Sequence, residues 1–210
     1  MESAEGLKQL LAESAIPPDS ETGLKLASYL RLLEKWNARI NLTSNTEWRV
    51  IGPMFREGIW ASGFYPPGAA AHLDIGSGAG FPALLLKVLI PRVEMDLVES
   101  RVKKSQFLET VAQALGLSGV RAHAMRLGDY LGRADEGKRW NCISWKGLKL
   151  GSDDFVRLRA HAWKDTQFWM FHGTEPALEA AQAIEKMCEL LRRERVPGRR
   201  ESYLSIYRPA

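Results

Sequence analysis

The sequence predicts an α/β fold, in which a mainly parallel, doubly wound sheet carries helices on both faces and follows a helical extension. Strand-like apolar runs alternate with helical patterns, as expected for such a sheet. The strand-like runs lie at 71–75, 93–98, 120–124, 140–145, 166–171 and 203–207, and the helical patterns at 81–90, 101–116, 152–163 and 175–195. A short strand around Val196 would complete the set, although the following Pro197 and Gly198 limit its length. The length of 210 residues suits one domain with an extension, and we expect the division at 1–65 and 66–210.

Two helices are expected before the sheet. Apolar residues recur at three- and four-residue steps between Leu7 and Asn37, and Pro17-Pro18 interrupts this pattern. The second helix ends in Trp36–Thr43, a segment with an aromatic ring, two asparagines and a threonine. From the residues alone, this segment is a helix end with side-chain caps.

A glycine-rich turn follows the first strand-like run. It reads Asp74-x-Gly76-x-Gly78-x-Gly80, and Phe81 stands where the dinucleotide fingerprint requires a glycine. An acid inside the turn would repel a pyrophosphate but suits a cofactor with an amino group and a sulfonium. Glu99 ends the next strand-like run, where doubly wound folds hydrogen-bond a ribose. The turn resembles motif I of the S-adenosylmethionine-dependent methyltransferases; the alternatives are a turn that binds nothing and a solvated acid at Glu99.

Composition and charge favour a globular protein that binds a polyanion. Hydrophobic residues make up 45% and charged residues 26% of the chain, which is ordinary for a soluble domain. No signal-peptide pattern and no run of membrane-spanning length occurs, so we expect a cytoplasmic protein without a membrane partner. The net charge is +4, and an arginine cluster lies near the C-terminus: Arg192, Arg193, Arg195, Arg199 and Arg200. This cluster either is a solvated helix end or binds a polyanion.

The two cysteines indicate neither a disulfide framework nor a metal site. Cys142 and Cys188 stand alone, without the spacing of zinc ligands. We expect both thiols to be buried; the alternative for Cys142 is a nucleophile of the kind used in pyrimidine C5 methylation.

Two longer segments extend the methyltransferase resemblance to a family. Tyr29–Thr43, which contains Lys-Trp-Asn-x-x-Ile-Asn-Leu-Thr, and Leu73–Pro82 are similar to segments of the RsmG (GidB) family, and Lys104-x-x-Phe107-Leu108 fits the same pattern. The resemblance implies a Rossmann-like class I methyltransferase that transfers a methyl group from S-adenosyl-L-methionine to N7 of a guanine in small-subunit (16S) ribosomal RNA. It implies ribosomal RNA or the small ribosomal subunit as the partner, and we expect a monomer.

The resemblance also implies three sets of site residues. The expected cofactor-binding residues are Asp74, Gly76, Ser77, Gly78, Gly80, Phe81, Glu99, Ser100, Arg126 and Asp129. Among these, a backbone amide near Arg126 or Asp129 would contact the adenine. The residues expected to bind the RNA are Asn37, Asn41, Trp145, Lys146 and His172, and the catalytic residues, expected to line one cleft, are Lys146, Arg126 and Arg56.

The chain departs from the family pattern at three places. Where the family has a run like Arg-His-x-x-Asp-Ser, only Arg56 is retained. The family's Ser-Arg-Ala after the fourth strand aligns with Trp145-Lys146-Gly147, which keeps the charge without the bidentate geometry of arginine. A lysine-glycine pair after the fifth strand becomes His172-Gly173, so a titrating group replaces a permanent charge. Trp145 either stacks on an extruded base or packs against the sheet.

Methylation at guanine N7 makes few chemical demands on the protein. Because N7 offers a lone pair in the ring plane, attack on a sulfonium methyl needs alignment and no catalytic base. Accordingly, no Asn-Pro-Pro-Tyr type sequence follows the fourth strand, and Tyr65-Pro66-Pro67 is expected to be a connector. Two other functions stay open: an RNA- or ribosome-binding protein without turnover, and a small-molecule methyltransferase in which the arginine cluster is incidental.

Overall fold

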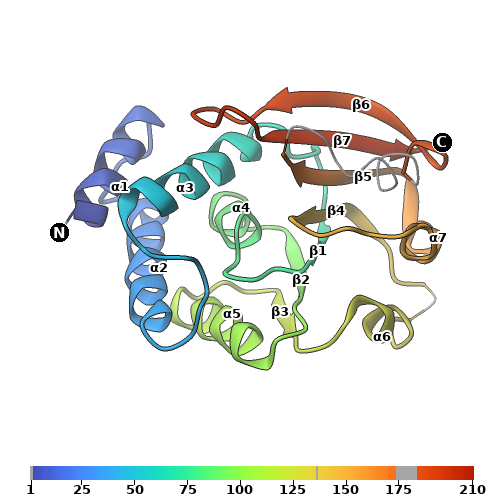
Figure 1. The fold of residues 1–210 in the computed structure, drawn as a ribbon, viewed down its shortest axis with the longest axis horizontal. Coiled ribbons are helices and arrows are strands. Elements are labelled where there is room, and N and C mark those ends of the chain that lie inside the picture. The colour runs from blue at the N-terminus through green and yellow to red at the C-terminus, as the bar shows by residue number, and fades with distance from the viewer. Residues whose placement is uncertain (1, 136, 174–183) are drawn as a thin grey trace.

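The protein is built around a seven-stranded sheet with helices on both faces (Figure 1). The computed structural model describes residues 2–135, 137–173 and 184–210. Neighbouring strands follow the order β3-β2-β1-β4-β5-β7-β6. The strands are β1 (Ala71–Ile75), β2 (Glu94–Val98), β3 (Val120–His123), β4 (Trp140–Lys146), β5 (Ala162–His172), β6 (Cys188–Arg195) and β7 (Tyr203–Pro209). Strands β1 to β5 are parallel, whereas β7 runs antiparallel to β5 and β6. The predicted mainly parallel, doubly wound sheet is confirmed.

The helices divide the hydrophobic core between the two faces of the sheet. The helices are α1 (Glu2–Glu13), α2 (Glu21–Asn37), α3 (Trp48–Ser62), α4 (Ala83–Leu89), α5 (Val102–Ala114), α6 (Leu127–Leu131) and α7 (Ser152–Ala160). Buried residues of α1 to α5 form one continuous cluster with one face of the sheet. Buried residues of α6 and α7 form a second cluster with the other face. The helical extension therefore shares its core with the sheet and does not form a core of its own.

Both ends of helix α2 have side-chain caps, and the one at its C-terminal end was expected from the sequence. The Ser20 hydroxyl accepts a hydrogen bond from the backbone N–H of Gly23 at the N-terminus, which satisfies one of the free amides of the first turn. At the other end, the Asn37 side-chain oxygen accepts from the backbone N–H groups of Leu42 and Thr43, each at 2.9 Å. The predicted apolar stripe of this helix is buried, with Leu26, Tyr29, Leu30 and Leu33 inside.

Helix α3 is a third helix before the sheet, where the sequence predicted two. Gly52, Pro53 and Gly58 interrupt its pattern, and glycine and proline are the poorest helix formers. The packing explains one of them, because a Cβ atom at Gly58 would lie 2.8 Å from the Cβ of Leu85 on α4. The helix forms because tertiary packing against α4 and α1 outweighs weak local propensity.

The C-terminal segment differs most from its expected structure. A helix was predicted over 175–195; residues 174–183 lie outside the described part of the chain, and residues 188–195 form strand β6. The expected strand around Val196 therefore comes earlier and ends at Arg195. Leu190, Leu191 and the arginines favour a helix by propensity, but pairing with β7 overrides this preference. Exposed charged side chains on such an edge strand also discourage pairing with other chains.

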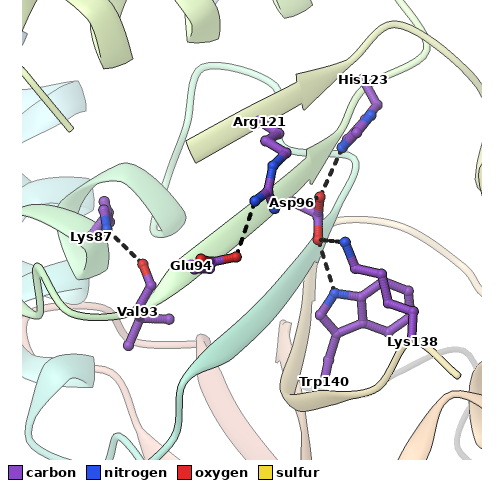
Figure 2. Close-up of polar contacts among 8 residues, drawn as sticks. All are labelled: Lys87, Val93, Glu94, Asp96, Arg121, His123, Lys138 and Trp140. Atoms are coloured by element: carbon purple, nitrogen blue, oxygen red, sulfur yellow. Dashed lines mark hydrogen bonds and ion pairs between the residues drawn. The ribbon is translucent and has the colours of Figure 1, made fainter. Parts of the chain in front are cut away.

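A buried carboxylate joins three strands near the other edge of the sheet (Figure 2). Asp96 on β2 accepts hydrogen bonds from His123 on β3, from Lys138, and from the indole N–H of Trp140 on β4. Burial alone would raise the pKa of Asp96, but the hydrogen bonds from these three groups outweigh it and hold the pKa well below its usual range. The ionised carboxylate thus fixes β2, β3 and the start of β4 relative to one another.

Candidate functional site

A cavity of about 430 Å³ opens at the carboxyl ends of β1, β2 and β4, the usual place for a ligand in an open α/β sheet. This volume lies within the range of small-molecule sites. Its lining comes from the ends of these strands and the segments that follow, and it includes four cationic residues. The lining residues are Ile75, Gly76, Gly78, Val98, Glu99, Ser100, Arg101, Lys104, Met125, Arg126, Leu127, Leu148, Lys149, Leu150 and Asp154.

The glycine turn between β1 and α4 forms one wall of the cavity. Gly76 and Gly78 have φ angles of +68° and +56°, a conformation that residues with a Cβ rarely adopt. A Cβ atom added at Gly78 would meet only the Gly76 carbonyl oxygen, at 3.7 Å, and would otherwise face open space. The turn is held from behind, because the buried Tyr29 hydroxyl of α2 donates a hydrogen bond of 2.6 Å to the Ala79 carbonyl. The main chain at Gly78 is therefore open to a ligand.

Both carboxylate oxygens of Glu99 accept hydrogen bonds from backbone N–H groups. One carboxylate oxygen accepts from the backbone N–H of Gly78 at 2.9 Å, and the other accepts from the N–H of Arg101 at 2.8 Å. The side chain is largely buried, yet it lines the cavity. These two hydrogen bonds fix the carboxylate beside the turn, so the alternative of a freely solvated acid at Glu99 does not hold.

Asp74 lies beneath the turn at the end of a buried chain of hydrogen bonds. The Ser144 hydroxyl of β4 donates to an Asp74 carboxylate oxygen. His72 Nε2 is 2.8 Å from the same hydroxyl, and the Tyr65 hydroxyl is 3.0 Å from His72 Nδ1. One assignment satisfies every group: Tyr65 donates to Nδ1, Nε2–H donates to Ser144, and Ser144 donates to Asp74. All four side chains are buried.

Burial is the main influence on the protonation of His72 and Asp74 in this chain of hydrogen bonds. It lowers the pKa of His72 to about 3, which keeps the imidazole neutral, as the assignment requires. It raises the pKa of Asp74 to about 6, while the Ser144 and Ser77 hydrogen bonds and the positive charge of Lys146 oppose that rise. Asp74 is therefore an anion at neutral pH that stands close to its titration range.

The structure brings together half of the residues expected to bind the cofactor. Gly76, Gly78, Glu99, Ser100 and Arg126 line the cavity, whereas Asp74 and Ser77 are buried behind the turn. The remaining three expected residues, Gly80, Phe81 and Asp129, are outside the cavity lining.

Gly80, Phe81 and Asp129 do not line the cavity. A Cβ atom at Gly80 would lie 2.5 Å from Leu84, so this glycine permits close packing. The Phe81 ring packs against Tyr29 and Phe55 in the core, with centroid distances of 5.3 and 5.4 Å. Asp129 is exposed on α6. In this segment, Met125, Arg126 and Leu127 line the cavity.

Several lining residues were not among the expected site residues. Arg101 and Lys104 follow β2, Met125 and Leu127 flank Arg126, and Leu148 to Leu150 follow β4. Their position after a parallel strand was the available signal, because such loops meet at one edge of the sheet. For the apolar lining residues, the type of side chain gave no further indication of a place in the site.

Trp145 is part of the core and not of the substrate surface. It lies inside β4 and is 1% exposed, with its ring edge-on to Phe155 of α7 at 5.6 Å. Strand β4 continues through Lys146, so the loop where a base could stack begins later than expected. Of the two interpretations of Trp145, packing against the sheet is the one that the structure shows.

Cys142 on the same strand is also fully buried, and burial raises the pKa of its thiol well above the usual value, so no thiolate nucleophile is presented.

The expected catalytic cations are spread over different parts of the surface. Lys146 forms an ion pair with Glu57 of α3, and Arg199 approaches the other oxygen of Glu57 at 4.0 Å. Burial lowers the pKa of Lys146, and the negative charge of Glu57 opposes this effect. Arg56 forms an ion pair with Glu13 at 2.8 Å and lines a separate hollow with Pro197 and Gly198. Arg56 and Arg126 therefore do not line one cleft, contrary to expectation.

The other three residues expected to bind RNA, Asn37, Asn41 and His172, have different surroundings. Asn37 is a helix cap whose oxygen is already used, and Asn41 is exposed. His172 Nε2 lies 2.8 Å from the Ser205 hydroxyl, which Arg193 also contacts through Nε at 3.0 Å. Burial lowers the pKa of His172, and the positive charge of Arg193 acts in the same direction, so the ring is neutral at pH 7.

The fold and cavity define a class of protein: an α/β protein with the architecture of the Rossmann-like methyltransferases. Solved structures similar in fold include a ribosomal protein L11 methylase from Lactobacillus delbrueckii subsp. bulgaricus, with a TM-score of 0.59 and 15% identity over 75% of this chain and 79% of that one. Another is a fibrillarin/Nop5p complex, with a TM-score of 0.59 and 12% identity over 77% and 85% of the two chains.

The sequence then identifies the family. Residues 23–199 match the family model GidB, described as rRNA small subunit methyltransferase G, and the chain belongs to this family. A Streptococcus pneumoniae protein named Ribosomal RNA small subunit methyltransferase G is 34% identical over 130 residues, 58% of this chain and 52% of that protein. A Streptococcus agalactiae protein of the same name is 29% identical over 188 residues, 85% of this chain and 74% of that protein. The chain thus spans about half the length of the first of these relatives. No helix in the described residues is long and apolar enough to cross a membrane.

Proposed function

We propose that the protein transfers a methyl group from S-adenosyl-L-methionine to N7 of a guanine in small-subunit (16S) ribosomal RNA. The observation that carries this proposal is the cavity at the end of β1, bounded by Gly78 and Glu99, in a chain of the GidB family. Such a substrate places the protein in the cytoplasm. Ribosomal RNA, or the assembled small subunit, is then the partner.

The residues present suit this cofactor. The main chain at Gly78 is open where a Cβ atom would otherwise stand, and the nearby carboxylates of Asp74 and Glu99 favour an amino group and ribose hydroxyls over a pyrophosphate. Arg126 lines the same cavity, and a backbone amide near it would contact the adenine. When bound, the cofactor would supply an electrophilic methyl group on a sulfonium.

The protein's own task is then to align the base. Because guanine N7 has a free lone pair, no residue needs to remove a proton, and the buried Tyr65–His72–Ser144–Asp74 chain is not required as a base. We propose Lys146 as a phosphate contact at the end of β4, since its side chain is still 25% exposed beside Glu57. Arg126 would serve at the cofactor cavity, and Arg56 at the separate hollow that contains Pro197.

A glycine variant tests the cofactor site. Gly78→Val would place a branched side chain in the cavity at a backbone angle that valine rarely adopts, so cofactor affinity should fall at least about a hundredfold. Calorimetry with S-adenosylhomocysteine measures this affinity. Gly68→Val is the matched control, because Gly68 also has a positive φ angle, +74°, and open space around it, but does not line the cavity. Equal affinity in the folded Gly78→Val protein would refute the placement.

The transfer reaction needs its own measurement. Labelled S-adenosylmethionine is incubated with small subunits, or their extracted RNA, from a strain that lacks this protein. Incorporation at a guanine supports the proposal. Cofactor binding without transfer to any ribosomal fraction would favour the RNA-binding alternative, which the neutralisation of Lys146 by Glu57 makes worth testing.

A further inference from the structure

A second hollow, of about 230 Å³, lies between the end of α2 and the start of α5. Its lining combines three cations, two apolar side chains and an amide: Lys35, Arg39, Lys103, Trp36, Ile40 and Gln106. No carboxylate is among these lining residues. The hollow is thus cationic and has an aromatic wall.

The three cations of this hollow are not neutralised by the described part of the protein. The side chains of Lys35, Arg39 and Lys103 make no ion pair or hydrogen bond with a described residue. Two of the three expected catalytic cations differ in this respect, since Arg56 pairs with Glu13 and Lys146 with Glu57. Three unpaired charges around one hollow attract an anion more strongly than charges that are already paired.

The apolar wall indicates what kind of anion fits. Trp36 packs on Phe107 with a centroid distance of 5.7 Å, which holds the indole in place, and its partly buried side chain still lines the hollow beside Ile40. An aromatic surface next to cations is the combination on which proteins bind single-stranded nucleotides, with the base on the ring and the phosphate on the cations. The Gln106 amide adds a donor and an acceptor for a base edge.

The hollow lies beside the cofactor cavity. Lys103 lines the hollow, while the adjacent Lys104 and Arg101 line the cavity, so the first turn of α5 separates the two. A polynucleotide that enters the cavity with one base can reach the hollow with another. Lys104 and Arg101 would meet the backbone between them.

We propose that this hollow binds a nucleotide of the RNA substrate other than the target guanine. The proposal rests on the proposed function and deepens it, because it assigns part of the RNA contact to the α2–α5 hollow and not to the C-terminal arginine cluster. Its role is to hold the RNA in register while the target base reaches the cavity.

A pair of double variants tests the proposal. Arg39→Ala/Lys103→Ala removes two cations from the hollow, and Arg92→Ala/Lys164→Ala removes two exposed cations without described ion pairs at the amino ends of β2 and β5. Affinity for transcribed 16S ribosomal RNA is measured against salt concentration. The first variant should bind more weakly, and its slope of log affinity against log salt should fall by about 1.4, the value for two single-strand phosphate contacts. The second variant should behave as the parent, and both should bind S-adenosylhomocysteine as the parent does.

Photo-crosslinking gives a second readout that does not depend on the variants. RNA that carries 4-thiouridine should crosslink to peptides from the end of α2 and the start of α5. A parental salt slope in the first variant, an equal loss in both variants, or crosslinks confined to β6 would each overturn the proposal. If the parent methylates ribosomal RNA in any of these cases, only this inference fails; if the parent binds no ribosomal RNA at all, the proposed function fails with it.

Discussion

Asp74 and Asp96 are both buried on adjacent parallel strands, yet their surroundings shift their pKa values in opposite directions. Burial raises the pKa of Asp74 from 3.8 to about 6. At Asp96, hydrogen bonds from His123, Lys138 and Trp140 outweigh burial, so its pKa is held well below the usual range. The first carboxylate is ionised at a cost to stability, whereas the second contributes stability when ionised.

Substitution by asparagine should therefore have opposite effects at these two positions. The folded protein holds the Asp74 proton more tightly than the unfolded chain does, so stability falls as pH rises from about 4 through 6, and the difference of two pKa units corresponds to about 3 kcal/mol at pH 8. Asp74→Asn should remove up to this cost. The stability from Asp96 is present above about pH 4 and is lost below it, so Asp96→Asn should cost about 2 kcal/mol at pH 8. Urea unfolding at pH 8 and pH 4.5 measures both, and a destabilised Asp74→Asn protein at pH 8 would contradict the reasoning for Asp74.

The Ser144 hydroxyl should set the pH at which the cofactor binds. Its hydrogen bond to Asp74 favours the carboxylate, as does Lys146, while burial and Glu99 disfavour it and His72 is neutral. If Asp74 must be ionised to hold an amino group, affinity should fall as pH drops through about 6, and Ser144→Ala should move that midpoint upward. Calorimetry from pH 5 to 8 with S-adenosylhomocysteine measures it. Ser105→Ala, at a buried serine on α5, is a control whose midpoint should match the parent.

At the level of elements, two asparagines near the end of α2 differ in role: Asn37 is a structural cap, whereas Asn41 is exposed. Asn37 accepts two backbone hydrogen bonds, so Asn37→Ala should lower the free energy of unfolding by about 1 to 2 kcal/mol. The exposed Asn41 should change it by less than about 0.5 kcal/mol when replaced by alanine. Thermal or urea unfolding compares the two. If Asn41→Ala lowers ribosomal RNA methylation without loss of stability, Asn41 contacts the substrate; if it changes neither, the exposed turn has no such role.

Elements could be predicted where local pattern and tertiary packing agree. The stripe on α2 and the turn after β1 were recognisable because Leu26, Leu30 and Leu33 repeat at helical spacing and because Gly76 and Gly78 have a conformation that requires glycine. Strand β6 was predicted as a helix because its own residues favour a helix by propensity, and its antiparallel pairing with the next strand, β7, overrides that preference. Trp145 shows the same limit at the site, because the sequence does not reveal that β4 extends past it.

At the scale of the whole molecule, the sheet order places every loop after a parallel strand at one edge, which is why a cavity at the end of β1 could be expected from the sequence. The sequence could not predict which charged side chains form ion pairs with one another at that edge. Glu57 lies 89 residues before Lys146, and only the tertiary fold brings the two side chains together. The sequence therefore did not show that Lys146 pairs with Glu57 or that Arg56 pairs with Glu13.

The hydrogen bond from Tyr29 to the Ala79 carbonyl gives the helical extension a share in ligand binding. A ligand that immobilises the glycine turn also immobilises the acceptor of this hydrogen bond, and the donor lies in the middle of α2. Amide hydrogens of α2 should accordingly exchange with deuterated solvent more slowly when the cavity is filled, although α2 contributes no residue to its lining. Hydrogen exchange in the first thirty-seven residues would then report the occupancy of a cavity formed entirely by later parts of the chain.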